Sequence, residues 1–180
     1  MQKVVKLGLI LLIVTAVSAG ALSVTNNFTK DIIEQKAIEA NLAYMREILP
    51  DADDFKVVES SAIADIIEVE EAYEAIKGGD TSGYVIKTKT SGYGGDVLIL
   101  TGINVDGTIA GMRVASQSET PNLGTKITED EFGSQFEGLS TDKELKLNED
   151  VDQVTGATIS STAAIKGINA SIKLFESVLK

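Results

Sequence analysis

The stretch Val-Leu-Ile-Leu-Thr-Gly-Ile at residues 97–103, followed by Asp106-Gly107, decides the fold of this chain. A short, almost uninterrupted apolar run that ends in turn residues is typical of a buried β-strand. An Asp-Gly pair favours a tight two-residue hairpin turn, so residues 108–116 are predicted to return as an antiparallel partner. Upstream, residues 84–90 are rich in β-forming side chains and predict a further hairpin. Together these segments predict a four-stranded antiparallel sheet.

Helical periodicity surrounds this predicted sheet. Residues 31–49 carry a broad apolar face and predict a helix with Asp31 as its N-cap. Residues 129–136 predict a short helix, residues 160–179 predict a longer one, and residues 66–76 are compatible with strand or helix. The final helix presents one apolar stripe to the sheet, formed by Ala164, Ile165, Ile168, Ile172 and Phe175. The expected fold class is α+β, a twisted antiparallel sheet packed with helices.

The amino terminus carries the pattern of a membrane segment. Lys3 and Lys6 precede residues 7–24, a run without a charged side chain. As a helix rising about 1.5 Å per residue this run is ~27 Å long, close to the hydrocarbon thickness of a bilayer, and residues 4–24 would contact lipid. The positive-inside rule places the two lysines in the cytoplasm and the rest of the chain outside it. We therefore expect one transmembrane helix ahead of the folded domain.

A cleaved signal peptide is the alternative interpretation of the same segment. Ala19-Gly20-Ala21 resembles the small-residue cleavage site that follows the apolar part of a signal peptide. Both interpretations place the main domain outside the cytoplasm.

Composition excludes several classes of function. The formal net charge of −11 leaves no basic surface for a nucleic acid partner. The chain contains neither cysteine nor histidine, which excludes disulfides, thiolate nucleophiles, histidine-ligated metals and catalytic triads. Any cofactor must therefore be attached through hydroxyl, carboxylate, amine or backbone groups.

A glycine turn and a cluster of hydroxyls stand just before the final predicted helix. The run Asp-Gln-Val-Thr-Gly-Ala-Thr-Ile-Ser-Ser occupies residues 152–161. The first N–H groups of a helix have no intrahelical acceptor, so a phosphate group can bind there, and small residues let it approach closely. A purely structural interpretation is that Thr158 or Ser160 caps the helix.

Three blocks of the chain resemble a family of covalent flavoproteins. Residues 152–158 resemble the flavin-attachment motif of membrane redox subunits, an Asp followed by Ser/Thr-Gly-Ala-Thr whose last Thr is esterified to FMN. Residues 118–127, Ser-Glu-Thr-Pro-Asn-Leu-Gly-Thr-Lys-Ile, resemble the family's Glu-Thr-Pro-Gly-Leu-Gly loop, and residues 91–95 resemble its Gly-Tyr-x-Gly element. With its membrane segment and size, the chain resembles the G subunit of Rnf-type ion-translocating ferredoxin:NAD oxidoreductases. That family is related to the usually longer C subunit of sodium-pumping NADH:quinone reductases.

The resemblance implies roles for individual residues. Thr158 would carry FMN through a phosphoester bond, and Asp152 would be recognised by the flavin transferase that attaches it. Tyr93 is a candidate to stack on the flavin, with core packing as the alternative. The other residues implied to bind the cofactor are Glu119, Thr120, Leu123, Gly124, Thr125, Lys126, Thr155, Gly156, Ala157 and Ser161.

The chain departs from the family pattern in its Glu-Thr-Pro loop. The family often has a histidine shortly before the loop, where this chain has Gln117 and Ser118, so no imidazole proton-transfer role is expected. Asn122 replaces a loop glycine. Asparagine tolerates a positive φ better than most other residues, so the loop is expected to keep its shape.

The resemblance implies an electron-carrying subunit of a translocase complex, without independent turnover. Its partners would be the other subunits, and the complex would couple ferredoxin–NAD redox chemistry to Na⁺ or H⁺ movement. Residues 1–25 would form the anchor, residues 26–54 a connecting helix, and residues 55–180 an extracytoplasmic FMN-binding domain. The alternatives are a stand-alone membrane-anchored extracytoplasmic flavin electron shuttle and a cofactor-free binding or scaffold domain.

Overall fold

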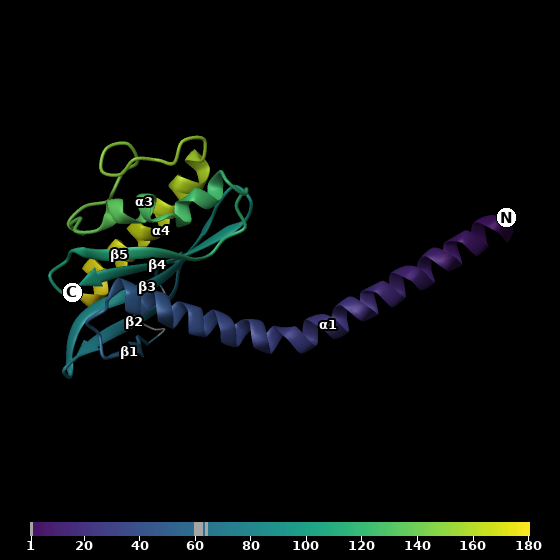
Figure 1. Cartoon of the computed structure of the whole chain (residues 1–180), viewed down its shortest axis with the longest axis horizontal. Helices are drawn as coiled ribbons and strands as arrows, with labels where there is room; N and C mark the ends of the chain where they lie inside the picture. The colour runs from purple at the N-terminus through teal and green to yellow at the C-terminus, as the bar shows by residue number, and fades with distance from the viewer. Residues whose placement is uncertain (1, 60–62, 64) are drawn as a thin grey trace. The chain divides into compact units, whose positions relative to one another are not determined.

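The computed structural model describes residues 2–59, 63 and 65–180. The chain divides into two compact units, Met1–Ala40 and Asn41–Lys180. The first unit contains most of one long helix. The second unit contains the end of that helix, a β-sheet and the remaining helices (Figure 1).

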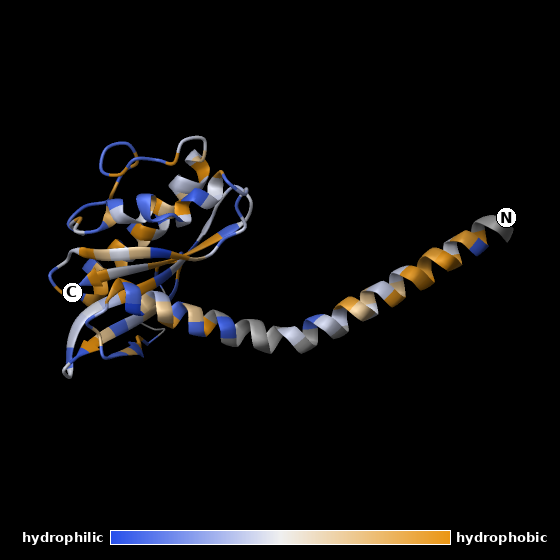
Figure 2. Cartoon of the chain, viewed as in Figure 1, coloured by the Kyte–Doolittle hydropathy of each residue, from blue (hydrophilic) through white to orange (hydrophobic). Residues whose placement is uncertain are grey.

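Helix α1 runs without a break from Gln2 to Ile48. It contains one segment, Val5–Ser23, that is long and apolar enough to cross a membrane, with a mean hydropathy of 2.2 (Figure 2). The Thr15 hydroxyl donates to the carbonyl of Leu11 at 2.9 Å, so this polar group is satisfied within the apolar segment. The prediction that a helix starts with Asp31 as N-cap is wrong, because the helical backbone continues through residue 31.

The sheet is antiparallel throughout, with strand order β1-β2-β3-β4-β5 (Figure 1). Its strands are β1 (Asp54–Val57), β2 (Val69–Lys77), β3 (Asp80–Ser91), β4 (Asp96–Asn104) and β5 (Ile109–Ser116). The α+β expectation is confirmed, but the sheet has five strands and not four. The segment left open between strand and helix forms β2, and the short edge strand β1 was not predicted.

The turn between β4 and β5 also differs from expectation. Three residues, Val105–Gly107, and not two, lie between Asn104 and Thr108, which are joined by a hydrogen bond of 2.8 Å from the Asn104 N–H to the Thr108 carbonyl. The Gly107 N–H donates to the Asn104 carbonyl at 3.0 Å, and Gly107 has φ 82°, which favours glycine. Three-residue hairpin loops commonly end with a residue in this left-handed conformation.

Helix α4 (Thr158–Leu174) packs against one face of the sheet, and the π-helical turn η3 (Phe175–Leu179) continues it. Close approach depends on Gly167, because a Cβ there would lie 2.7 Å from Oγ1 of Thr88 on β3. The Thr90 hydroxyl adds a buried hydrogen bond of 2.9 Å to the carbonyl of Ala163. The predicted apolar stripe is confirmed: Ala164, Ile165, Ile168, Ile172 and Phe175 are all buried.

The end of α1 covers the other face of the sheet. Met45, Ile48 and Leu49 form a cluster with Val85 and Leu100. Gly102 of β4 pairs with Gly111 of β5, and a Cβ on Gly102 would overlap the Ile48 side chain. Gly102 therefore makes room for Ile48.

Between β5 and α4 the chain forms short helical turns and loops. The predicted helix over residues 129–136 is divided into α3 (Asp130–Gly133) and the 3₁₀ turn η2 (Ser134–Phe136). A further 3₁₀ turn, η1 (Gly124–Thr128), precedes them. Phe132 and Phe136 are buried and pack edge to face with their ring centroids 5.3 Å apart, which fixes these turns on the core.

Candidate functional site

A pocket of about 500 Å³ lies where three segments of the second unit meet. The segments are the β3–β4 loop, the loop from Ser118 to η1, and the start of α4. Ligand pockets commonly have volumes of roughly 300–1,000 Å³, so the space suits a cofactor. Its lining residues are Tyr93, Glu119, Thr120, Leu123, Gly124, Gly156, Ala157, Thr158, Ile159 and Ser160.

Thr158 is the first residue of α4, and it is exposed at the wall of this pocket. The N-cap is Ala157, which supplies no side-chain hydrogen bond, so the interpretation of Thr158 or Ser160 as the cap is wrong. Among the described residues, none forms a hydrogen bond with the Thr158 hydroxyl. The first helical bond runs from the Ser161 N–H to the Ala157 carbonyl at 2.9 Å. The N–H groups before it have no intrahelical acceptor and suit a phosphate.

The segment before α4 is held in a tight turn. Gly156 has φ 78°, and a Cβ there would lie 3.1 Å from Cδ1 of Leu123, so glycine suits both the backbone and the contact. The Ala157 N–H donates to the Val154 carbonyl at 2.9 Å, and the Val154 N–H donates to the Ser161 hydroxyl at 3.0 Å. Ser161 is fully buried and supports this turn from inside, away from the pocket wall.

Glu119 is a buried acid in the pocket, with only 5% of its surface exposed. Its Oε1 accepts hydrogen bonds from the N–H groups of Tyr93 at 2.8 Å and Gly94 at 3.3 Å. Its Oε2 accepts a hydrogen bond of 2.7 Å from the Ser160 hydroxyl. One carboxylate thus joins all three segments that form the pocket.

The Glu-Thr-Pro loop keeps the shape expected for it. Asn122 has φ 60°, which confirms that asparagine occupies a left-handed position. Its N–H donates to the Thr125 hydroxyl at 3.0 Å, and the Thr125 N–H donates to the Thr120 carbonyl at 3.3 Å. Thr125 therefore stabilises the loop internally and does not line the pocket.

Three of the predicted site residues line a second cavity of about 480 Å³: Lys126, Asp152 and Thr155. Asp152 is exposed there, and its backbone is held by Gln135 of η2. The Asp152 N–H donates to Gln135 Oε1 at 2.8 Å, and Gln135 Nε2 donates to the Asp152 carbonyl at 3.4 Å. The structure thus separates the acidic end of the motif from the pocket at Thr158.

Sequence reasoning missed two residues of the main pocket, Ile159 and Ser160. Ile159 is 53% exposed at the start of α4, and Leu123 and Tyr93, also in the pocket wall, are 42% and 71% exposed. An apolar residue directly after the attachment threonine was the available signal for Ile159. The role of Ser160 depends on Glu119, which lies 41 residues earlier, so no local pattern reveals it.

Comparison with known proteins matches both units of the chain. A family model described as the FMN-binding domain matches residues 92–173, and one described as the RnfG N-terminal region matches residues 1–48. The chain is 36% identical to the G subunit of the Na⁺-translocating ferredoxin:NAD⁺ oxidoreductase complex of Acetobacterium woodii, over 98% of this chain and 94% of that protein. It is 35% identical to the G subunit of the ion-translocating oxidoreductase complex of Methanosarcina acetivorans, over 95% of this chain and 94% of that protein.

A solved structure shares the fold. The crystal structure of the C subunit of the Na⁺-translocating NADH-quinone reductase from Parabacteroides distasonis matches with a TM-score of 0.50 and 22% identity. The match covers 67% of this chain and 69% of that one. The identities to the curated relatives and their nearly complete coverage decide the family: this chain belongs to the G subunits of Rnf-type ion-translocating oxidoreductase complexes.

Proposed function

We propose that this protein is an electron-carrying subunit of a membrane ion-translocating ferredoxin:NAD⁺ oxidoreductase, with FMN attached to Thr158 through a phosphoester bond. The observation that carries the proposal is the exposed Thr158 hydroxyl at the start of α4, beside a cofactor-sized pocket. Family membership and the match to the FMN-binding domain support the choice of cofactor.

The residues around Thr158 fit a phosphodiester. Its remaining negative charge would lie at the N-terminal end of a 17-residue helix, where free N–H groups and the helix dipole stabilise an anion by about 0.3–1 kcal/mol at an exposed position. Gly156 and Ala157 carry little side-chain bulk beside the hydroxyl. The Tyr93, Leu123 and Ile159 side chains supply apolar wall against which a flat ring system can lie.

Bound flavin supplies one- and two-electron redox chemistry, and the chain holds it in place. A covalent tether keeps the cofactor at high effective concentration, whereas free FMN outside the cytoplasm would be lost by dilution. The chain has no nicotinamide-binding fingerprint and no carboxylate within Val5–Ser23. We therefore assign NAD⁺ binding and ion conduction to other subunits, with Na⁺ and H⁺ both open as the coupling ion.

Attachment of the flavin requires an activated donor and a transferase. With a flavin dinucleotide as the donor, the Thr158 hydroxyl would supply the oxygen of the new phosphoester bond and would lose its proton to a base of the transferase. The phosphoanhydride bond of the donor would break, with the nucleoside monophosphate as leaving group. We propose that the transferase recognises Asp152, which is exposed in the second cavity while Gln135 holds its backbone.

The membrane segment would keep the flavin domain at the bilayer surface. We propose that Lys3 and Lys6 stay in the cytoplasm and that the domain lies outside it. The proposed boundaries are an anchor at residues 1–25, a connecting helix at 26–54 and the FMN-binding domain at 55–180. A cleaved segment would release the domain, and the intact mass of the mature chain distinguishes the two cases.

Denaturing electrophoresis under ultraviolet light tests the attachment. The wild-type chain, produced with its transferase, should give a fluorescent band whose mass exceeds that of the chain by FMN less one water. Thr158→Ala should abolish the fluorescence, and Thr158→Ser should retain some because a hydroxyl remains. Thr162→Ala is the matched control, since Thr162 is exposed on the same helix and its hydroxyl donates to the Thr158 carbonyl at 2.7 Å. A fluorescent Thr158→Ala band would refute the assignment, and a non-fluorescent wild-type band would favour the scaffold alternative.

A further inference from the structure

The Glu119 carboxylate is buried without a cationic partner among the described residues. Its two oxygens accept hydrogen bonds from the Tyr93 N–H at 2.8 Å, the Gly94 N–H at 3.3 Å and the Ser160 hydroxyl at 2.7 Å. Burying a carboxylate is costly, and neutral donors offset that cost only when their geometry is good. An apolar side chain would fill the same space at lower cost, so stability alone does not explain an acid here.

Glycines leave space for the Glu119 carboxylate on two sides, because a side chain at either position would collide with it. A Cβ on Gly92 would overlap Glu119 Oε1, and a Cβ on Gly124 would lie 2.6 Å from Glu119 Oε2. A Cβ on Gly94 would overlap the Ser118 carbonyl oxygen. The backbone of the Gly-Tyr-Gly loop and the backbone of η1 can therefore both approach the Glu119 side chain closely.

The three partners lie beside residues proposed to hold the flavin. The Tyr93 N–H belongs to the residue whose side chain lines the pocket, and Ser160 lies two residues after Thr158. We propose that Glu119 is a positioning residue for the flavin: it fixes the Tyr93 loop against the first turn of α4 and sets a negative charge beside the ring system. This inference rests on the proposed attachment at Thr158.

Two measurements test the two halves of the proposal. In the full chain in detergent, without flavin, amide hydrogen exchange at Tyr93 should quicken at least about tenfold in Glu119→Ala, because its acceptor is lost. In the flavinylated chain, Glu119→Gln should raise the midpoint potential of the flavin, because removing a nearby negative charge makes reduction easier. Glu137→Gln is the control, since Glu137 is exposed and lines neither the pocket at Thr158 nor the second cavity.

Each outcome decides between support and refutation. Faster exchange together with a higher potential supports the proposal. An unchanged potential, with or without faster exchange, overturns it, because Glu119 would then be a structural contact only. If the Glu119 variants do not fold, Ser160→Ala removes one partner and keeps the charge; it should leave Tyr93 protected while the fluorescence anisotropy of the flavin falls, and an unchanged anisotropy would overturn the proposal. The exchange effect should persist in Thr158→Ala, so failure of the attachment and failure of the positioning role remain distinguishable.

Discussion

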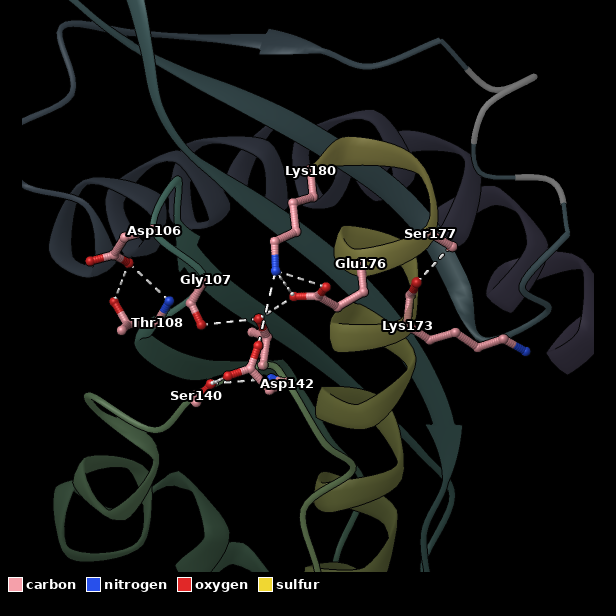
Figure 3. A network of polar contacts seen from close by, with 10 residues as sticks. Asp106, Gly107, Thr108, Ser140, Asp142, Lys173, Glu176, Ser177 and Lys180 are labelled. Atoms are coloured by element: carbon pink, nitrogen blue, oxygen red, sulfur yellow. Dashed lines mark hydrogen bonds and ion pairs between the residues drawn. The ribbon is translucent and has the colours of Figure 1, made fainter.

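The two ends of helix α4 are built in opposite ways. At the N-terminal end no side chain caps the helix, and Thr158 and Ile159 are exposed beside a pocket. At the C-terminal end, called the closed end below, polar contacts join the turn η3 to the loop after β4 and to the segment at Thr141 and Asp142 (Figure 3). The N-terminal end is called the open end. The buried Thr141 hydroxyl shares its one proton between two acceptors, the Gly107 carbonyl at 3.0 Å and Glu176 Oε1 at 2.7 Å.

The C-terminal network continues beyond that buried hydroxyl. Lys180 Nζ donates to both carboxylate oxygens of Glu176, at 3.1 and 3.0 Å. Nearby, Phe175 is 1% exposed and packs edge to face on Tyr84 at 6.0 Å between ring centroids. Polar side chains at the C-terminal end of α4 are tied to neighbouring segments, whereas at the N-terminal end the exposed Thr158 hydroxyl has no hydrogen-bond partner among the described residues.

The largest effect on stability is expected at the closed end. Phe175→Ala should lower the free energy of unfolding by about 3–5 kcal/mol, because it removes a fully buried aromatic ring and leaves a cavity. Chemical denaturation of the full chain in detergent, followed by circular dichroism, measures this. Val178→Ala is the control, since Val178 is 48% exposed on the same turn. Equal effects of the two substitutions would contradict the description of this end as core.

A smaller loss is expected when the polar network is cut at its buried centre. Thr141→Val keeps the shape of the side chain but removes both of its hydrogen bonds and leaves the Gly107 carbonyl without that donor. The expected loss is about 1–3 kcal/mol by the same denaturation measurement. Thr128→Val provides a matched control, because the Thr128 hydroxyl makes one exposed bond to the Thr125 carbonyl. A loss no greater than that of the control would show that the network adds nothing.

The Glu176 carboxylate at the closed end is expected to make a smaller, pH-dependent contribution to stability. The hydrogen bond from Thr141, and then that from Lys180, hold the pKa of Glu176 below its ordinary value of 4.5. A lowered pKa in the folded state means that the ionised group stabilises the fold above pH 4.5 and that this contribution disappears as the pH falls through the folded pKa. Glu176→Gln should therefore lower the urea midpoint at pH 7, and the difference from wild type should shrink as the pH falls below 4.5. A pH-independent difference would rule out this origin.

The smallest effect on stability is expected at the open end. Thr158→Ala should change the free energy of unfolding by no more than about 0.5 kcal/mol, because the side chain is exposed and no described residue hydrogen-bonds to it. The same substitution should remove all covalent flavin, so stability and cofactor loading separate completely at this position. Comparing melting curves of the two chains without flavin checks the first part. A loss as large as that of Thr141→Val would mean that Thr158 has a structural role.

Local patterns predicted the elements that depend on neighbouring residues. The apolar run at 97–103 forms the centre of β4, the stripe from Ala164 to Phe175 is buried, and Asn122 takes the expected positive φ. Local patterns left open or missed the features that depend on pairing between two segments. Strand β2 has an acidic, mixed pattern, and its pairing with β1 and β3 makes it a strand. The turn after β4 is one residue longer than predicted, because the pairing of β4 with β5 sets the register of the two strands.

In the candidate site, too, some residues were predicted from the sequence and others were placed only by the structure. The motif around Thr158 and the loop containing Glu119, Leu123 and Gly124 were identified from their resemblance to the motifs of a known family, and the structure brings these residues into one pocket. The sequence did not reveal that Thr155 lines a different cavity or that Ser161 is an internal support. Both assignments depend on which way the chain turns at Gly156.

The sequence by itself determined the apolar segment at the amino terminus, the class of the fold, and the absence of cysteine and histidine as attachment groups for a cofactor. These properties follow from residue type and short-range periodicity. Only the tertiary structure decided that Glu119 meets Tyr93 and Ser160, 26 and 41 residues away, and that the two ends of α4 differ. Periodicity reports which side chains share a face of one element, whereas a pocket is made where separate elements are brought together by the packing of the sheet.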